Sequence, residues 1–325
     1  MADARHTSPP DSVAAVGESG LIEAVVSLLT TDADVLVGPG DDAAVVRVGG
    51  GADGREVLVS TDMAVDGRHF RRDWSSAEDV GHRVAAANLS DVAAMGGTAT
   101  ALVVAIAVPG DLPTAWAMDL TRGMLAESQL VGASIVGGDV VESDRLTIGV
   151  TVLGACAGPV VGRGGACPGD VVAVAGRLGW AAAGLAVLSR GFRSPRAVVE
   201  AHRRPEPPYA QGPVAAAAGA TAMIDVSDGL LADLGHLAVA GSVAIDVTST
   251  RVEVAEPLQA VGAALGIDPV ELVLRGGDDH ALAATFPAGA ELPPGWRPVG
   301  VVAGGSGVTV DGAEPEGETG HRHYR

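Results

Sequence analysis

The stretch AEDVGHRVAAANLSDVAAMGG, residues 77–97, decides the fold. Val80, Val84, Val92 and Met95 recur at the spacing of one helix face, and the glycine pair that follows is typical of a helix C-cap. The pattern predicts one long helix from about residue 77 to residue 95. Its apolar stripe and the polar NLSD segment indicate that the helix both packs in a core and carries functional side chains.

Short apolar segments surround this helix and predict strands at 35–37, 43–48, 56–61, 100–108, 133–137 and 145–154, with further helices at 18–29 and 114–130. The Gly- and Pro-rich segment GPVVGRGGACPGD, residues 158–170, is interpreted as a linker. Beyond it we expect a strand at 171–175, a helix at 180–188, a Pro-rich loop around HRRPEPP, further strands and helices at 209–219, 222–226, 229–240, 243–247 and 256–274, and strands to about 310. The predicted organisation is a flexible leader at 1–16, a domain at 17–157, the linker, and a domain at 171–325.

Charge and composition exclude several kinds of protein. The net charge of −19 over 325 residues disfavours nucleic acid and anionic membranes as partners. All 21 basic Lys+Arg residues are arginine, which excludes a P-loop or a protein-kinase site, because both need a lysine on the phosphates. Aromatic residues make up only 3% of the chain, so small aliphatic side chains are expected to fill the cores of an α/β fold.

The cysteines and the N-terminus favour a cytoplasmic protein. Cys156 and Cys167 lack the ligand spacing of a zinc site and are interpreted as two reduced thiols. The N-terminus lacks an apolar core of signal-peptide length, and no uninterrupted apolar run predicts a membrane span.

Aspartates recur where apolar runs end beside Gly or Ser. The set is Asp41, Asp42, Asp62, Asp91, Asp139, Asp225, Asp228, Asp278 and Asp279. Converging carboxylates need cations, and hard oxygen donors without His or Cys select Mg²⁺ or Ca²⁺ over zinc. The set therefore predicts phosphate handling by metal ions. Each Gly-Asp pair taken alone is also typical of a turn, and Asp228 also fits an N-cap of the helix that follows.

The ordered segments GDDAAV, STDMAVDGRHF, NLSDVAAMGG, GGD, PGD, DVSDGLLADLGH and GGDD resemble the thiamine-monophosphate kinase family of the PurM-like superfamily. The resemblance runs from about residue 17 to the C-terminus, and NLSDxAAMG followed by DxSDGLxxDLGH is its specific part. It implies a PurM-like two-domain fold, with an N-terminal mixed sheet that forms a barrel in a homodimer and a C-terminal α/β domain. It also implies phosphorylation of thiamine monophosphate to thiamine diphosphate, the last step of thiamine diphosphate biosynthesis, by direct transfer of the ATP γ-phosphoryl group with several Mg²⁺ ions.

The resemblance also implies roles for individual residues. The implied Mg²⁺ ligands are Asp41, Ser60, Thr61, Asp62, Asp91, Asp139, Asp225 and Asp228. Of these, Asp91 and Asp225 are expected to be the most critical. The implied ATP contacts are Gly138, Asp139, Arg163 and Ser227, and the implied substrate contacts are His69, Asp278 and His321. From its position in the turn, Asp42 is expected either to orient the turn beside Asp41 or to support a metal ligand from behind.

Two segments depart from the family pattern on the substrate side. GGDDHAL, residues 276–282, stands where the family has GGEDYEL, so Asp278 replaces a glutamate and His280 a tyrosine. His321 stands at a position that is aromatic in the family. Two alternatives stay open: another PurM-like ATP-dependent enzyme with a different acceptor, and a degenerate, non-catalytic nucleotide or thiamine-phosphate binding protein.

Overall fold

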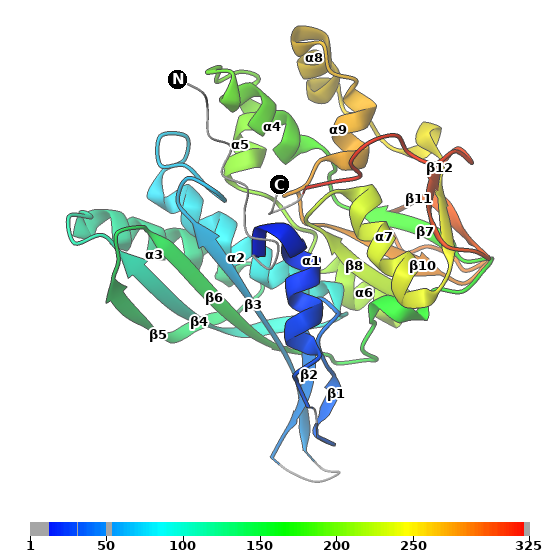
Figure 1. Cartoon of the computed structure of the whole chain (residues 1–325), viewed down its shortest axis with the longest axis horizontal. Helices are drawn as coiled ribbons and strands as arrows, with labels where there is room; N and C mark the ends of the chain where they lie inside the picture. The colour runs from blue at the N-terminus through cyan, green and yellow to red at the C-terminus, as the bar shows by residue number, and fades with distance from the viewer. Residues whose placement is uncertain (1–12, 31, 50–53, 322–325) are drawn as a thin grey trace.

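The computed structural model describes residues 13–30, 32–49 and 54–321, and each half of the chain contains a six-stranded sheet (Figure 1). The first half comprises α1 (Val13–Val26), β1 (Val35–Val37), β2 (Ala44–Val48), β3 (Arg55–Val65), α2 (Ala77–Ala94), β4 (Thr98–Val108), α3 (Thr114–Gln129), β5 (Ser134–Glu142) and β6 (Thr147–Ala155). The second half comprises η1 (Arg163–Gly165), β7 (Val171–Ala175), α4 (Trp180–Ser189), α5 (Arg196–Arg203), α6 (Gln211–Ala217), β8 (Ala222–Val226), α7 (Leu230–Gly241), β9 (Ala244–Val247), η2 (Ser249–Arg251), α8 (Glu256–Leu265), α9 (Pro269–Arg275), β10 (Ala281–Phe286), β11 (Trp296–Ala303) and β12 (Gly307–Val310).

Helix α2 has the ends that its sequence predicts. Ser76 and Asp79 form a capping box, in which each side chain accepts a hydrogen bond from the backbone N–H of the other residue. At the other end Gly96 adopts a left-handed conformation, with φ at 79°, and the Gly97 N–H donates to Val92 O at 3.0 Å. The expected long helix is therefore confirmed.

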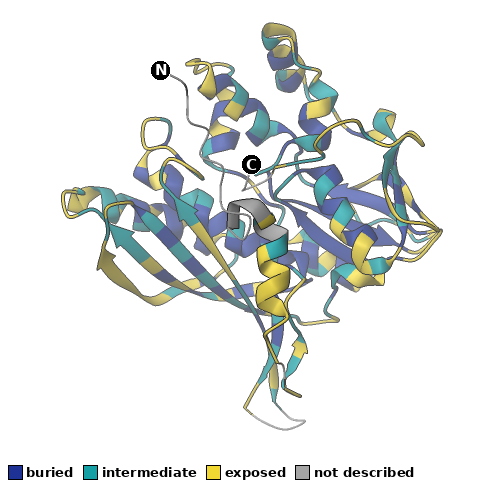
Figure 2. Ribbon diagram, viewed as in Figure 1, coloured by how far each residue is buried: buried dark blue, intermediate teal, exposed yellow. Residues whose placement is uncertain are grey.

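The N-terminal sheet has the order β1-β2-β3-β6-β4-β5, and helices α2 and α3 cover only one of its faces (Figure 1). The covered face contributes Leu58, Leu102, Ile148 and Val152 to a buried cluster with Leu89 of α2. The other face and the β5 edge remain open in the single chain, as the exposed residues along β5 indicate in Figure 2. Exposed apolar side chains there are Met63, Val103, Val136, Val140 and Val141.

The second sheet has the order β12-β9-β11-β7-β10-β8, and its strands are buried more completely (Figure 2). A separate hydrophobic cluster joins the two halves of the chain. In it, Ala93 and Ala94 of α2 pack with Ala215 and Ala216 of α6 and with Met223 of β8. Helix α2 is thus part of the core of the first half and of the contact with the second. This double packing fixes the position of its polar face relative to β8.

Several predicted boundaries were wrong. Residues 13–16, expected in the leader, are helical, and Gly17 with φ at 71° kinks α1; residues 1–12 lie outside the described ranges. The segment expected as one element at 256–274 contains two helices, because Gly266 with φ at 67° ends α8 and Pro269 begins α9. A helix, α5, overlaps the segment expected as a Pro-rich loop.

Strands β3 and β5 run past their expected ends at 61 and 137, to residues 65 and 142. Both strands keep neighbours with which to pair: β3 continues along β6, and β5 continues along β4. Asp62 and Asp139 therefore lie within strands, whereas we expected them at strand ends.

No single helix within the described ranges is long and apolar enough to span a membrane. Helices α8 and α9 satisfy the length and composition together, but they are bent by 115° relative to each other. Cys156 and Cys167 are free cysteines, as expected.

The crossing of α2 and α3 is close enough to require glycine. A Cβ atom added to Gly123 would lie 2.0 Å from Glu78 O, whereas a Cβ on Gly235 of α7 would meet nothing within 4 Å. Gly123→Ala should therefore lower the free energy of unfolding by roughly 1–3 kcal/mol through overpacking. Gly235→Ala is the matched control and should be neutral or stabilising by up to about 1 kcal/mol, because alanine favours helix. Urea denaturation of both variants tests this, and equal stabilities would contradict the close crossing.

Candidate functional site

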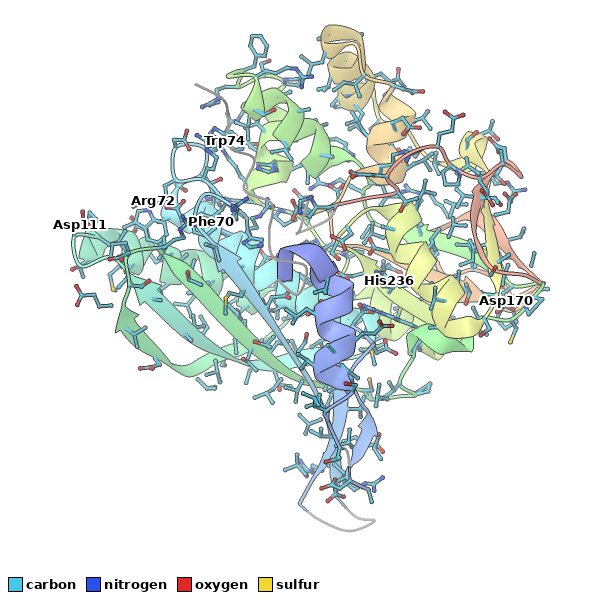
Figure 3. The ribbon with its side chains drawn as sticks, in the orientation of Figure 1. Phe70, Arg72, Trp74, Asp111, Asp170 and His236 are labelled. Carbon is cyan, nitrogen blue, oxygen red and sulfur yellow. The ribbon has the colours of Figure 1, made fainter. Side chains whose placement is uncertain are left out.

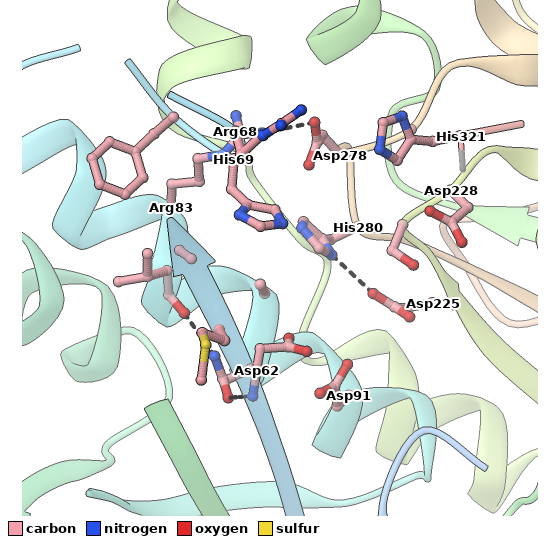
Figure 4. A pocket seen from close by; sticks show the side chains of 18 of the residues that line it. Asp62, Arg68, His69, Arg83, Asp91, Asp225, Asp228, Asp278, His280 and His321 are labelled. Atoms are coloured by element: carbon pink, nitrogen blue, oxygen red, sulfur yellow. Dashed lines mark hydrogen bonds and ion pairs between the residues drawn. The ribbon is translucent and has the colours of Figure 1, made fainter. Parts of the chain in front are cut away.

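A cleft of about 1200 Å³ lies between the two halves of the chain (Figure 4). Its walls come from β3, from one face of α2, from the residues around Arg163, from the end of β8 and from the 276–280 turn. Asp62 and Asp91 lie on one side of this cleft and Asp225, His280 and Asp228 on the other (Figure 4). Segments that are far apart in the sequence thus meet at one place.

The first wall joins β3 to α2 through polar side chains. Ser60 Oγ donates to Asp91 Oδ2 at 2.7 Å, and Asn88 Oδ1 accepts the backbone N–H of Asp62 at 3.2 Å. Burial raises the pKa of Asp91 well above its ordinary value, and the neighbouring carboxylates, that of Asp62 first, raise it further. Asp91 therefore lacks an adequate positive partner among the described residues.

The second wall is centred on Asp225, which is 4% exposed at the end of β8. Its Oδ2 accepts hydrogen bonds from Ser90 Oγ at 3.0 Å and from His280 Nδ1 at 2.9 Å. Burial lowers the pKa of His280, but the hydrogen bond and charge of Asp225 more than offset this, so the pKa is raised overall. Because Ser90 and Asp91 are adjacent on α2, this one helix holds both walls together.

Arg163 occupies the acidic end of the cleft. Its guanidinium donates to Asp42 Oδ1 at 2.5 Å, and its backbone N–H donates to Asp41 Oδ2 at 2.9 Å. Asp42 Oδ2 is buried without a hydrogen-bond partner. Burial raises the pKa of Asp42 to about 8 although Arg163 lowers it, so one arginine compensates these carboxylates only in part.

The opposite end of the cleft carries an ion pair and aromatic residues. Arg83 of α2 lies 2.7 Å from Asp278, and this cation holds the pKa of Asp278 below its usual value although burial acts to raise it. His69 Nδ1 accepts the backbone N–H of Val65 at 2.9 Å. Trp74, labelled in Figure 3 on the loop between β3 and α2, also lines the cleft and has the guanidinium of Arg71 4.3 Å from its ring centroid.

Most of the residues that the sequence singled out line this cleft. They are Asp41, Asp42, Ser60, Asp62, His69, Asp91, Arg163, Asp225, Ser227, Asp228, Asp278 and His321. Asp228 also groups with Asp233 and His236, whose ligand atoms lie within 4.8 Å of one another. Asp233 Oδ2 already accepts hydrogen bonds from the backbone N–H groups of Asp228 and Gly229.

Four of the residues that the sequence singled out do not line the cleft; they are Thr61, Gly138, Asp139 and Asp279. Thr61 points to the other face of β3, because side chains alternate along a strand, and its Oγ1 donates to Val150 O at 3.0 Å. Its side chain is therefore not positioned as the expected ligand. Gly138 and Asp139 lie on the edge strand β5, where the Asp139 carboxylate accepts the backbone N–H of Val140. Asp139 therefore does not reach the cleft of its own chain.

The predictions missed Arg83 as a cleft residue, and they assigned no contact to Ser90 or His280. The signal for Arg83 was present, since Arg83, Ala87 and Asp91 recur at intervals of four residues on one helix face, and all three line the cleft. The contact of His280 had no local signal, because it depends on a turn in which Asp278 and His280 both have positive φ, at 67° and 51°.

The donor set of the cleft fits magnesium. The converging ligand atoms are carboxylate and hydroxyl oxygens, and one carboxylate oxygen of Asp42 is buried without a hydrogen-bond partner. Burial, and after it the charges of neighbouring carboxylates, raise the pKa of Asp91. Mg²⁺ prefers hard oxygen ligands and is commonly shared between protein carboxylates and substrate phosphates. The residues that could hold such ions are Asp41, Ser60, Asp62, Asp91, Asp225 and Asp228.

Known proteins match the chain over most of its length. The family models for the AIR synthase related protein, N-terminal and C-terminal domains, match residues 40–156 and 167–290. The thiamine-monophosphate kinase of Mycobacterium tuberculosis (strain H37Rv) is 46% identical over 313 residues, which cover 95% of this chain and 92% of that relative. The thiamine-monophosphate kinase of Corynebacterium glutamicum is 37% identical over 337 residues and is matched over 100% of both chains. A solved structure of AaThiL complexed with AMPPCP and TMP has a TM-score of 0.87 at 32% identity, covering 95% of this chain and 97% of that chain.

Asp279 should make stability depend on pH. Its Oδ1 accepts the N–H of Ala181, its Oδ2 is buried without a partner, and burial raises its pKa to about 7. From about pH 4 to pH 7 the folded state holds a proton that the unfolded state releases, so the free energy of unfolding falls as pH rises. Asp279→Asn removes this titration and should flatten that fall, whereas the exposed control Asp111→Asn should leave it unchanged. Urea denaturation in EDTA from pH 4 to pH 8 measures the slopes, and indistinguishable slopes would refute the raised pKa.

Proposed function

The chain belongs to the thiamine-monophosphate kinase family within the AIR synthase related proteins, and on this basis we propose that it transfers the γ-phosphoryl group of ATP to thiamine monophosphate. The products are ADP and thiamine diphosphate. The observation that carries the proposal is the cleft, in which six oxygen-donating side chains converge opposite the substrate-side residues His69, Arg83 and Asp278. The fold and identity of the relatives favour this reaction over the two alternatives that the sequence left open.

We propose that Asp41, Ser60, Asp62, Asp91, Asp225 and Asp228 hold several Mg²⁺ ions. Bound Mg²⁺ would neutralise the ATP phosphates and the acceptor phosphate and stabilise the charge that develops during in-line transfer. The chain has no lysine to supply that charge. The part of the cleft that these carboxylates line therefore suits the triphosphate.

The remaining residues of the cleft would bind and orient the two substrates. Arg163 and Ser227 line the acidic part, where a guanidinium can contact phosphate through paired N–H donors. His69 and Arg83 line the opposite part, where the acceptor would lie. No general base is required, because the attacking group is an anionic phosphate oxygen that carries no proton to remove.

Asp278 and His321, which depart from the family pattern, both line the cleft. Asp278 is one methylene shorter than the glutamate of the family pattern, but Arg83 lies 2.7 Å from it and holds its carboxylate in place. His321 also lines the cleft, and its backbone N–H donates to Asp228 O at 3.0 Å. We propose that Asp278 and His321 contact the thiamine part of the substrate, next to Trp74.

We also propose that the protein is a cytoplasmic homodimer paired through the open face of the N-terminal sheet. Met63 is 65% exposed and Val103 is 38% exposed on this surface, and covering such apolar side chains favours association. Pairing would bring the β5 edge against the partner. In this arrangement Gly138 and Asp139 could complete the nucleotide site of the second copy, which would reconcile their implied ATP role with their distance from their own cleft.

The kinase reaction is tested directly by incubating the purified protein with ATP, Mg²⁺ and thiamine monophosphate. We expect stoichiometric ADP and thiamine diphosphate, separated by chromatography, and no product in EDTA. Thiamine and a nucleoside monophosphate serve as control acceptors and should not react. The proposal fails if no thiamine diphosphate forms at any Mg²⁺ concentration.

A mixing experiment tests the role of Asp139 across the dimer. Asp91→Asn and Asp139→Asn should each lose nearly all activity while the chain stays folded, because each removes a charge from a shared metal site. If the two residues act in one site from different chains, an exchanged 1:1 mixture should recover about one quarter of wild-type activity, since half of the dimers are mixed and one of their two sites is intact. Met118→Ala, which changes an exposed side chain on α3, controls for activity lost during purification and subunit exchange. No recovery after verified exchange would place Asp139 outside the partner's site.

A further inference from the structure

The 278–280 turn directs two side chains to opposite parts of the cleft. Asp278 and His280 both adopt the left-handed conformation, with φ at 67° and 51°, which non-glycine residues rarely do without compensation. Backbone hydrogen bonds hold the turn, from the Asp278 N–H to Ser227 O at 2.8 Å and from the His280 N–H to Val226 O at 3.0 Å. Asp278 meets Arg83, whereas His280 meets Asp225 (Figure 4). The strained backbone thus gives His280 a specific partner.

We propose that His280 is a positioning residue for Asp225. Its Nδ1–H donates to Asp225 Oδ2 at 2.9 Å, and among the described residues no hydrogen bond to Asp225 Oδ1 is found. Fixing Oδ2 sets the rotation of the carboxylate and leaves Oδ1 for a metal ion in the cleft. Such supporting hydrogen bonds orient metal ligands and change their affinity for the metal. This inference rests on the metal-dependent function proposed above.

The chemistry of the two side chains assigns the donor. Asp225 Oδ2 can only accept from its neighbours when ionised, so the Nδ1 atom of His280 must carry the hydrogen of this bond. Ser90 also lies at 3.0 Å from Oδ2, but its single hydroxyl hydrogen has a closer acceptor in Ala87 O, at 2.6 Å. His280 is therefore the more dependable donor to Asp225.

Burial makes this bond persistent. His280 is 6% exposed and Asp225 is 4% exposed, so water competes weakly for either side chain. The contact also links three segments of the chain, because Ser90 belongs to α2, Asp225 to β8 and His280 to the turn. Losing the imidazole would free the carboxylate to rotate in the cleft, although its own strand would stay in place.

Three variants separate positioning from a merely structural role. His280→Leu removes the donor, whereas His280→Asn keeps an N–H donor near the position of Nδ1 and tolerates positive φ well. His82→Leu is the matched control, because His82 Nδ1 lies 2.8 Å from Glu127 in another largely buried pair that does not line the cleft. Mn²⁺ binding to the full-length protein without nucleotide, measured by electron paramagnetic resonance, gives a readout that is independent of turnover.

We expect His280→Leu to weaken Mn²⁺ binding by about tenfold or more, the usual effect of losing a hydrogen bond behind a metal ligand. His280→Asn should recover most of the affinity, and His82→Leu should match the wild type. Unchanged Mn²⁺ affinity in a folded His280→Leu variant would overturn the proposal. Because this test needs no turnover, failure of the kinase assay with normal Mn²⁺ results would count against the proposed function alone.

The wild-type protein provides a second test in case His280→Leu does not fold. In ¹⁵N-histidine-labelled protein, the Nδ1–H signal that is absent in the His280→Asn variant belongs to His280. It should shift when Mg²⁺ is added, whereas the His82 signal should not. A His280 signal that does not respond to saturating Mg²⁺ would contradict the proposal.

Discussion

The structure depends on one electrostatic constraint, the repulsion between carboxylates that share a buried cleft. Burial and the charges of neighbouring carboxylates raise the pKa values of Asp42 and Asp91. Arg163 compensates one end of this group and Arg83 is engaged with Asp278 at the other. These carboxylates are therefore only partly compensated by the arginines of the cleft, as expected for a site that binds the cations proposed above.

Helix α2 is the element that makes this arrangement possible. Such a cluster keeps its geometry only if rigid elements oppose the repulsion, and α2 is anchored in the core of the first half and against α6 and β8 of the second. Its consecutive residues Ser90 and Asp91 reach opposite walls. A rotation of this helix would disturb both walls at once, so packing and site geometry are coupled through it.

Structural features that depend on the local sequence were predicted accurately. The extent of α2 follows from its apolar spacing and terminal glycines, and the cleft gathers most of the acids because each follows or ends an apolar segment. Prediction failed where the arrangement of the strands decides. Thr61 was assigned to the site by motif, but its side chain lies on the face of β3 opposite Ser60 and Asp62. The pairing of β5 with β4 places Asp139 away from the cleft of its own chain. The His280 contact was not predictable, since it requires a left-handed turn whose cost is met by contacts with distant segments.

The carboxylates that line the cleft affect the binding of nucleotide as well as the chemistry. A nucleotide triphosphate is itself strongly negative, so it cannot approach Asp41, Asp91 and Asp225 favourably unless cations enter with it. Nucleotide and metal affinity would then be linked, and linkage is reciprocal: the factor by which bound metal strengthens nucleotide binding equals the factor by which bound nucleotide strengthens metal binding. A residue that only orients Asp225 can in this way affect nucleotide affinity without contacting the nucleotide. In the opposite part of the cleft Arg83 already neutralises Asp278, so this carboxylate does not require a metal ion. The 276–282 segment nevertheless joins the two parts of the cleft, because Asp278 contacts Arg83 and His280 contacts Asp225. A change in this segment can therefore affect acceptor contacts and the proposed metal ligand together.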